Sequence, residues 1–221
     1  MKFIKKLTCI LPPYAYIPLT VAVIFRFSHY FFTKLITENR VHYDLSLPID
    51  EAIPFVPFFI LFYILSYAQW FFSYVYHAHS GKESCFKILT SDIISNILCM
   101  ICFLALPTSI VRPTVENNSI WHILTNMIYR LDTPVNLFPS MHCMSSWLCF
   151  KGSLLMKKAP RWYSWVQLVF TFFVFASTVF VKQHFFIDII AGVLFVEIGW
   201  AISKHFSIWK VFDRISYRIK L

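Results

Sequence analysis

The sequence has few charged residues and almost no glycine. Of its 221 residues only 14% are charged, whereas 58% are hydrophobic and 19% are aromatic. A soluble domain carries about a quarter of charged residues, so this chain has too little polar surface to cover a water-facing globule. With four glycines in all, it also has little room for a glycine-rich nucleotide-binding loop. These shortages exclude an ordinary soluble enzyme and favour an integral membrane protein.

Neither the six cysteines nor the net charge of +9 indicates a soluble protein. The cysteines fall within or beside apolar runs, without the spacing of a secreted disulfide framework. Cys99 and Cys102 have no second pair that would complete a zinc site, and we expect neither a metal nor a cofactor. The basic residues lie between apolar segments and at the termini, where topology and anionic lipid headgroups explain them. No nucleic-acid partner is expected.

Apolar segments of membrane-spanning length recur along the whole chain. We predict an all-α bundle of six transmembrane helices that forms a single integral membrane domain over residues 1–221. The predicted spans are approximately 11–32, 54–76, 88–106, 140–156, 162–181 and 185–203. Between the third and fourth spans, apolar residues recur at helical spacing from Ile120 to Ile128, which predicts a short amphipathic helix on the membrane surface. Packing of this helix against the bundle as a lid is the alternative.

The basic residues predict the orientation of the bundle. With the N-terminus inside, 13 Lys and Arg residues fall in inner segments and five in outer segments, while Arg26 and Lys151 lie within spans. The inner residues are Lys2, Lys5, Lys6, Lys82, Lys87, Lys157, Lys158, Arg161, Lys204, Lys210, Arg214, Arg218 and Lys220, and the outer residues are Lys34, Arg40, Arg112, Arg130 and Lys182. Such an excess is typical of cytoplasmic loops, so we expect a multi-pass plasma-membrane protein with both termini in the cytoplasm. Arg26 and His29 are expected to extend to the membrane interface, with the bundle interior as the alternative.

Three polar clusters emerge on the outer side of this predicted bundle. They follow the third span, precede the fourth span, and join the fifth span to the sixth: Arg112-Pro113, Pro139-Ser140-Met141-His142, and Lys182-Gln183-His184 with Asp188. Each cluster lies where an apolar run begins or ends. The shared side supports one common site outside the cell.

The last cluster has the parts of an oriented nucleophile. His184 and Asp188 are four residues apart at the start of a helix, so they lie on one face. The carboxylate can accept a hydrogen bond from one imidazole nitrogen and leave the lone pair of the other nitrogen free to attack. A pair that only satisfies itself at the membrane surface is the alternative.

The other residues can supply a proton donor and an anion site. His142 can protonate a departing oxygen. Ser140 can add its hydroxyl to the free amides at a helix start, although Ser is also a common helix cap. The planar guanidinium of Arg112 can bind two phosphate oxygens, and the ammonium of Lys182 can add a point charge. Contact of both side chains with lipid headgroups alone is the alternative. Together these groups favour phosphoryl transfer without a metal.

The three clusters resemble a known family motif. The segments Pro107-Thr108 through Arg112-Pro113, Phe138-Pro139-Ser140-Met141-His142, and Ser177 through His184 to Asp188 are similar to the three-part motif of the type 2 phosphatidic acid phosphatase superfamily. The resemblance implies a six-helix membrane enzyme that acts on lipid phosphates or diphosphates without a metal, at an extracytoplasmic site. It also implies the site roles: His184 becomes the phosphohistidine, Asp188 orients it, His142 is the general acid, Arg112 binds phosphate and Ser140 holds it.

The chain departs from the family pattern at three positions. Ala105 stands where the first motif usually begins with Lys, Thr178 where the third motif has Arg, and Met141 where the second motif has Gly. Two phosphate-binding cations are therefore absent. Lys182, two residues before His184, is expected to replace them.

The leading functional prediction is a lipid phosphate or diphosphate phosphatase with a phosphohistidine intermediate. The segment Lys182 to Asp188, which reads Lys-Gln-His-Phe-Phe-Ile-Asp, also resembles the branch that contains phosphosphingolipid synthases, so a lipid phosphotransferase is the first alternative. A non-catalytic membrane protein that binds or transports lipid is the second. Membrane lipids and a lipid phosphate substrate are the expected partners, and the sequence favours no particular lipid or oligomeric state.

Overall fold

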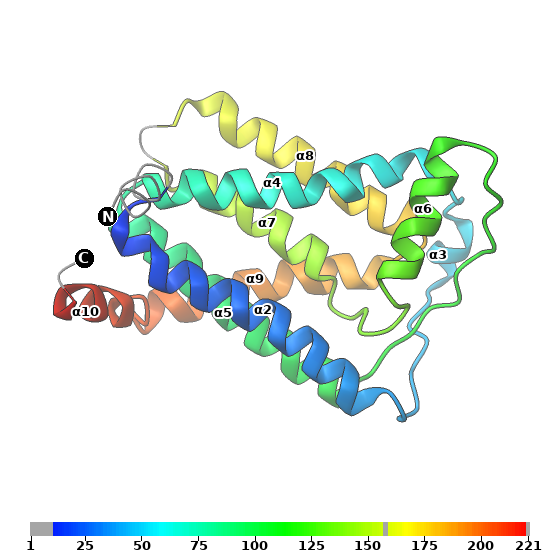
Figure 1. Ribbon diagram of the computed structural model, residues 1–221, viewed down its shortest axis with the longest axis horizontal. Helices are drawn as coiled ribbons and strands as arrows, with labels where there is room; N and C mark the ends of the chain where they lie inside the picture. Colours follow the sequence, from blue (N-terminus) through cyan, green and yellow to red (C-terminus); the bar gives the residue numbers. More distant parts are fainter. Residues whose placement is uncertain (1–10, 157–158, 220–221) are drawn as a thin grey trace, which may run out of the picture.

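The computed structural model describes residues 11–156 and 159–219, which form a helical bundle (Figure 1). Its elements are η1 (Pro13–Ala15), α2 (Tyr16–Thr37), α3 (Pro48–Ala52), η2 (Pro57–Phe59), α4 (Ile60–His79), α5 (Lys82–Ala105), α6 (Ile120–Leu131), α7 (Met141–Ser153), α8 (Arg161–Phe180), α9 (Phe186–His205) and α10 (Lys210–Arg218). The described residues contain isolated β-bridges but no strand, so the all-α prediction is confirmed. Seven residues that entered the predictions lie outside the described part: Lys2, Lys5, Lys6, Cys9, Lys157, Lys158 and Lys220.

Within residues 11–156 and 159–219, five helical segments are long and apolar enough to cross a membrane. They are Pro13–Thr37, Pro57–His79, Lys82–Ala105, Arg161–Phe180 and Phe186–His205, and they match five of the six predicted spans. The remaining predicted span, 140–156, corresponds to α7, which has 13 residues. At about 1.5 Å per residue such a helix is shorter than the ~30 Å hydrocarbon core. The count of six spans therefore stays a prediction.

Helix α7 is the centre of the bundle. It contacts α4, α5, α8 and α9, and nine of its residues are buried. Small residues permit close packing: a Cβ atom at Gly192 of α9 would lie 3.0 Å from the carbonyl oxygen of Ser140. A larger residue at Gly192 would therefore push α9 away from the start of α7.

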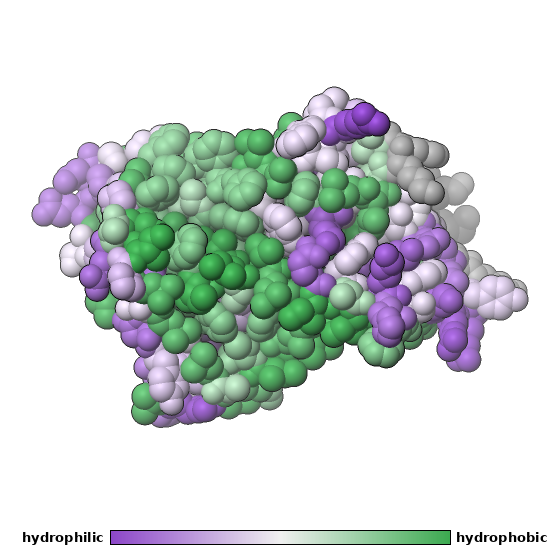
Figure 2. All heavy atoms as spheres, turned by 180° about the vertical axis from the view of Figure 1, so that it is seen from behind, coloured by the Kyte–Doolittle hydropathy of each residue, from purple (hydrophilic) through white to green (hydrophobic). Residues whose placement is uncertain are grey.

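The side chains on the outside of the bundle form an apolar belt. On the face shown in Figure 2, hydrophobic side chains gather over the middle of the molecule and most hydrophilic ones lie towards its two ends. Phe31, Phe71 and Phe72 are between 58% and 69% exposed. Exposed apolar surface of this extent is unfavourable in water but suits the hydrocarbon of a bilayer. Together with the five apolar helices, the belt indicates a membrane protein.

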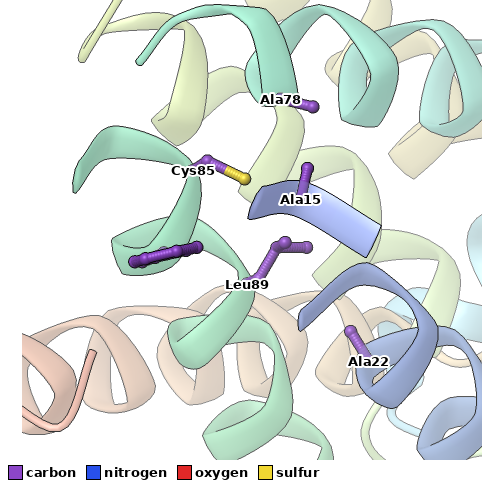
Figure 3. Close-up of a cluster of buried hydrophobic side chains, with 6 residues drawn as sticks. Ala15, Ala22, Ala78, Cys85 and Leu89 are labelled. Carbon is purple, nitrogen blue, oxygen red and sulfur yellow. The ribbon is translucent and has the colours of Figure 1, made fainter. Parts of the chain in front are cut away.

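The two ends of the bundle differ. Helices α3 and α6 lie at one end and α10 lies at the other (Figure 1). Near the α10 end, a cluster with several small side chains joins the start of α2 to α4 and α5; Ala15, Ala22, Ala78, Cys85 and Leu89 are labelled in Figure 3. The Tyr14 hydroxyl donates to the carbonyl of Ala78 at 2.7 Å across the same contact. This cluster fixes the packing at the end of the bundle opposite α3 and α6.

The predicted amphipathic segment does form a helix, α6. Ser119 caps it, accepting a hydrogen bond from the backbone nitrogen of His122 at 3.4 Å. Trp121, Leu124 and Ile128 pack in one apolar cluster with residues of η2 and α4. This contact with the bundle is the one that a lid would make, whereas a location at a membrane surface stays a prediction.

Arg26 and His29 point into the bundle, so the expectation that they extend to the interface was wrong. Arg26 forms an ion pair with Asp92 of α5 and a hydrogen bond to Ser145 of α7. His29 is 2% exposed and its Nε2 lies 3.0 Å from the Asn96 side-chain oxygen. A buried charge is most stable beside an opposite charge. Helix α5 supplies that charge to Arg26 through the carboxylate of Asp92.

Candidate active site

The structure brings the three polar clusters together at the end of the bundle where α3 and α6 lie. The backbone nitrogen of Ser140 donates to the carbonyl of Asp188 at 3.1 Å, which joins the start of α7 to the first turn of α9. Arg112, in the segment after α5, donates to the side-chain oxygen of Gln183 in the turn between α8 and α9. The ring centroids of His142 and His184 are 6.2 Å apart. Side chains from three distant parts of the sequence therefore share one site.

His184 lies in a tight turn that fixes its backbone. The backbone nitrogens of Gln183 and His184 both donate to the carbonyl of Thr178, at 2.9 and 3.1 Å. The imidazole Nδ1 lies 3.2 Å from the Asp188 carboxylate and 3.1 Å from the Leu137 carbonyl oxygen. Because both neighbours are acceptors, Nδ1 carries a proton and Nε2 carries the lone pair. His184 is thus held in the tautomer that a nucleophile at Nε2 requires.

Asp188 is fully buried in the first turn of α9. The carboxylate oxygen that faces His184 also accepts a hydrogen bond from the backbone nitrogen of Phe185 at 2.9 Å. A helix N-terminus stabilises negative charge through its free amides and its dipole. The fold therefore holds this carboxylate in place independently of His184.

Aromatic side chains of α4 hold His142. Its ring stacks on Tyr63 with centroids 4.0 Å apart, and Trp70 is 5.1 Å away. The buried Nε2 of His142 has no hydrogen-bond partner among the described residues. The stacking fixes the ring of His142, whose centroid lies 6.2 Å from that of His184.

Ser140 is the N-cap of α7. It is fully buried, and its hydroxyl oxygen accepts a hydrogen bond from the backbone nitrogen of Cys143 at 3.4 Å. This is the capping role considered from the sequence. A phosphate contact from Ser140 stays a prediction.

Arg112 is held in a fixed orientation by backbone and side-chain oxygens. One guanidinium nitrogen donates to the carbonyls of Tyr129 and Asp132, at 3.2 and 2.6 Å, and the other donates to Gln183. The guanidinium lies 4.6 Å from the centroid of the Tyr129 ring. Burial lowers the pKa of Arg112 below its ordinary value and raises the pKa of Tyr129 to about 12. The ordinary pKa of Arg is so high that Arg112 stays charged at neutral pH.

Lys182 contacts the segment around α3. Its backbone adopts the left-handed conformation, with a φ of 51°. The ammonium group donates to the carbonyl of Asp50 at 2.9 Å and also to the carbonyl of Ile53. Two of its three protons are thus used by the protein, and one is left for a ligand.

A cavity of about 390 Å³ opens beside these residues. Arg112, Lys182 and His184 line it, whereas Ser140, His142 and Asp188 are buried outside its lining. Three carboxylates from the segment that contains α3 also line it: Asp44, Asp50 and Glu51. Within the described ranges, no three His, Cys, Asp or Glu side chains are grouped so that they could hold a metal ion.

Three residues of the site were not assigned a role from the sequence. The Tyr63 hydroxyl donates to the Asp132 carboxylate at 3.2 Å, so Tyr63 links the segment of Arg112 to His142. Asp132 also accepts from the Tyr30 hydroxyl at 2.7 Å. Gln183 is 1% exposed, and its oxygen is bound by Arg112. Gln183 could have been predicted as a site residue, because it is polar and precedes the predicted nucleophile. The residues around Tyr63 in the sequence give no such indication.

Two other residues, Ala105 and Thr178, stand at the positions of the missing family cations. Ala105 is exposed at the last residue of α5. Thr178 is buried and its hydroxyl donates to the Phe175 carbonyl at 2.8 Å. Because the carbonyl of Thr178 accepts from the backbone of His184, this residue supports the turn through its main chain.

Comparison with known proteins assigns the chain to a family. No curated protein and no solved structure is significantly similar to it. The model of the PAP2 superfamily matches residues 35–202, a range that includes the three clusters and most of the bundle. This is the type 2 phosphatidic acid phosphatase superfamily that the motifs resemble. The chain therefore belongs to the PAP2 superfamily, whose members are phosphatases and phosphotransferases.

Proposed function

We propose that the protein is a metal-independent lipid phosphate or diphosphate phosphatase that works through a phosphohistidine at His184. The observation that carries the proposal is the state of His184. Two acceptors hold its Nδ1, and its side chain lines a cavity that Arg112 shares. Family membership supports this class of chemistry.

In the first step, Nε2 of His184 attacks phosphorus while the bond from phosphorus to the lipid oxygen breaks. The leaving oxygen takes a proton from His142, so a lipid phosphate releases an alcohol and a lipid diphosphate releases a lipid monophosphate. The imidazole of His184 becomes positively charged, and the Asp188 carboxylate at 3.2 Å stabilises that charge. Arg112 binds the equatorial oxygens, where negative charge increases in the transition state.

In the second step, water attacks phosphorus and gives a proton to His142. The bond between phosphorus and His184 breaks, and inorganic phosphate leaves. Both histidines return to their starting states, so this cycle is complete without the consumption of a metal or cofactor. In a phosphotransferase, an alcohol would take the place of water in this step, and the burial of His184, at 8% exposed, would favour that variant by limiting water access.

The position of the site in the membrane is part of the proposal. Helix α10, with its basic residues Lys210, Arg214 and Arg218, lies at the end of the bundle opposite α3 and α6 (Figure 1). Basic segments are retained in the cytoplasm, so the site faces the outside of the plasma membrane. Helix α7 leads from the site end towards the end where α8 begins (Figure 1), which supports the proposal that it serves as the sixth crossing and that both termini are inside.

The test is phosphate release by the purified protein in mixed micelles with phosphatidate, a prenyl diphosphate and phosphatidylglycerol phosphate, in the presence of EDTA. We expect release by the wild type and by a His205→Ala control, which changes an exposed histidine far from the site, and none by His184→Ala. Activity that persists in His184→Ala, or that EDTA abolishes, contradicts the proposal. If no lipid is turned over, even with an alcohol acceptor added, the non-catalytic alternative replaces it.

A further inference from the structure

Helix α6 supports the arginine of the proposed phosphate site. At the carboxyl end of this helix, the carbonyls of Tyr129 and Asp132 accept from one guanidinium nitrogen of Arg112, at 3.2 and 2.6 Å. A helix C-terminus favours a cation there, because its last carbonyls have no partners within the helix. The end of α6 therefore fixes Arg112 from one side.

The same helix also contacts the turn that carries His184. The Tyr129 hydroxyl donates at 2.7 Å to the carbonyl of Val181, the residue that caps the end of α8. The side chain of Val181 is fully buried and packs in one apolar cluster with Ile128 of α6. Burial raises the pKa of Tyr129 to about 12, so its hydroxyl keeps its proton at neutral pH and can donate it. Helix α6 is thus fastened to the turn three residues before the proposed nucleophile.

The ring of Tyr129 makes a further contact with the arginine. The Arg112 guanidinium lies 4.6 Å from the ring centroid, within the range of about 6 Å in which an aromatic face attracts a cation. Tyr129 therefore contacts Arg112 with its ring and its carbonyl, and the turn with its hydroxyl. The hydrogen bond from Arg112 to Gln183 closes this set of contacts.

These contacts leave part of the guanidinium for a ligand. Arg112 has five N–H groups. Three of them are taken by the carbonyls of Tyr129 and Asp132 and by the side chain of Gln183. The Nε atom has no hydrogen-bond partner in the part of the chain that the structure describes. The two N–H groups that remain match the number that a contact with two phosphate oxygens needs.

We propose that Tyr129 is a positioning residue that sets the place of Arg112 relative to His184. This inference rests on the proposed phosphohistidine chemistry. A phosphoryl group bound by Arg112 must lie in line with Nε2 of His184, and a misplacement of about 1 Å can lower the rate by about hundred-fold. The ring of Tyr129 orients the arginine, and its hydroxyl holds the turn of the nucleophile. Because the two roles belong to different parts of one side chain, they can be removed separately.

The test compares two variants with the wild type in mixed micelles, using the lipid that the wild type hydrolyses fastest among phosphatidate, a prenyl diphosphate and phosphatidylglycerol phosphate. Tyr129→Phe keeps the ring but loses the hydrogen bond to Val181, so we expect kcat to fall by about ten-fold while KM stays the same. Tyr129→Leu also loses the ring, so KM should rise by about five-fold in addition. Tyr217→Leu, which changes an exposed tyrosine of α10, is the control and should leave both constants unchanged.

Binding of inorganic phosphate provides a second arm that needs no turnover. Isothermal titration calorimetry should give a Kd that is about five-fold higher for Tyr129→Leu than for the wild type, and unchanged for Tyr129→Phe. A residue that only stabilised α6 would alter kcat and Kd together. Normal phosphate binding with a lowered kcat in Tyr129→Phe is therefore the result that a purely structural role does not predict.

The outcomes separate the inference from the proposed function. Wild-type constants in both variants, or equal losses of kcat and phosphate affinity in both, would overturn the role of Tyr129 and keep the phosphohistidine enzyme. If the wild type bound inorganic phosphate but turned over no lipid, the proposed function would fail, and an unchanged Kd in Tyr129→Leu would overturn the inference with it. A wild type that neither bound phosphate nor turned over a lipid would overturn both.

Discussion

The orientation of the proposed general acid depends on its aromatic neighbours. Tyr63 stacks on His142 at 4.0 Å and donates its hydroxyl to Asp132 at 3.2 Å. We expect Tyr63→Phe to retain the stack and most of the activity. Tyr63→Leu removes the stack and should lower kcat by roughly hundred-fold, because a positioned proton donor contributes about 10²–10⁴-fold. Single-turnover kinetics with a lipid phosphate would measure the effect.

A folding defect is a competing explanation for Tyr63→Leu, and a substrate with a better leaving group separates the two. An acidic leaving alcohol needs little protonation, so it should restore the rate of Tyr63→Leu if Tyr63 positions the acid. A rate that stays low with both substrates would contradict that role.

Lys182 has one proton left for a ligand after its contacts with the carbonyls of Asp50 and Ile53. If it replaces the cations missing at Ala105 and Thr178, Lys182→Ala should raise KM by about ten-fold or more, because a charged hydrogen bond contributes about 1.5–3 kcal/mol. Lys34→Ala, at the end of α2, is the control. Steady-state kinetics equal to those of the wild type would rule out phosphate binding by Lys182.

Local spacing predicted part of the site at the level of single residues. His184 and Asp188 are four residues apart, and their side chains do meet, at 3.2 Å. Tyr63 could not be predicted in this way, because its partners His142 and Asp132 are separated from it by 79 and 69 residues. Contacts between distant helices depend on how the bundle packs, and an apolar segment rich in Tyr and Phe gives no sign of which ring will face the site.

At the scale of elements, the short helix α3 holds the turn that carries His184. The Asp50 carboxylate accepts from the backbone nitrogen of Phe186, the first residue of α9, at 2.7 Å. We expect Asp50→Ala to reduce the free energy of unfolding by about 1–2 kcal/mol, the usual effect of losing a helix cap. The looser turn should also lower kcat by roughly ten-fold.

Thermal unfolding in detergent and steady-state kinetics would measure the two effects. Glu38→Ala, which removes an exposed carboxylate after α2, is the matched control. If Asp50→Ala lowered stability while kcat stayed the same, α3 would support the fold without positioning the nucleophile.

Hydropathy predicted the long helices well, because each is a mostly apolar segment of about twenty residues, the length that crosses a bilayer. It overestimated α7, which ends at Ser153 within the predicted span 140–156. It did not predict α3 or α10, since these helices have five and nine residues and are shorter than the segment of about 11–18 residues in which a hydrophobic period is recognised. Short helices of this kind are stabilised by their contacts more than by their own sequence.

At the scale of the whole molecule, a buried ion pair joins α2 to α5 in the interior of the bundle. The side chains of Arg26 and Asp92 are 13% and 4% exposed. Asp92→Ala would leave a buried charge without its partner, so we expect it to cost about 3–5 kcal/mol. The double variant Arg26→Met with Asp92→Ala removes both charges and should recover part of that loss.

Unfolding in detergent of the two single variants and the double variant gives the coupling free energy. Additive losses would show that the pair does not stabilise the bundle.

The sequence does not predict this pair, because 66 residues separate the partners and Asp92 lies within an otherwise apolar span. That the three polar clusters lie at one end of the bundle was predictable, because it depends only on the number of helices that cross the bundle between one cluster and the next.

The most direct test of His184 as the nucleophile is to trap the covalent intermediate. The wild type is mixed with a lipid substrate labelled at phosphorus and quenched in alkali, where phosphohistidine survives, and the labelled peptide is identified by mass spectrometry. We expect label on His184 in the wild type and no label in His184→Ala. Turnover without any labelled histidine, or label on another residue, would contradict a phosphohistidine mechanism at His184.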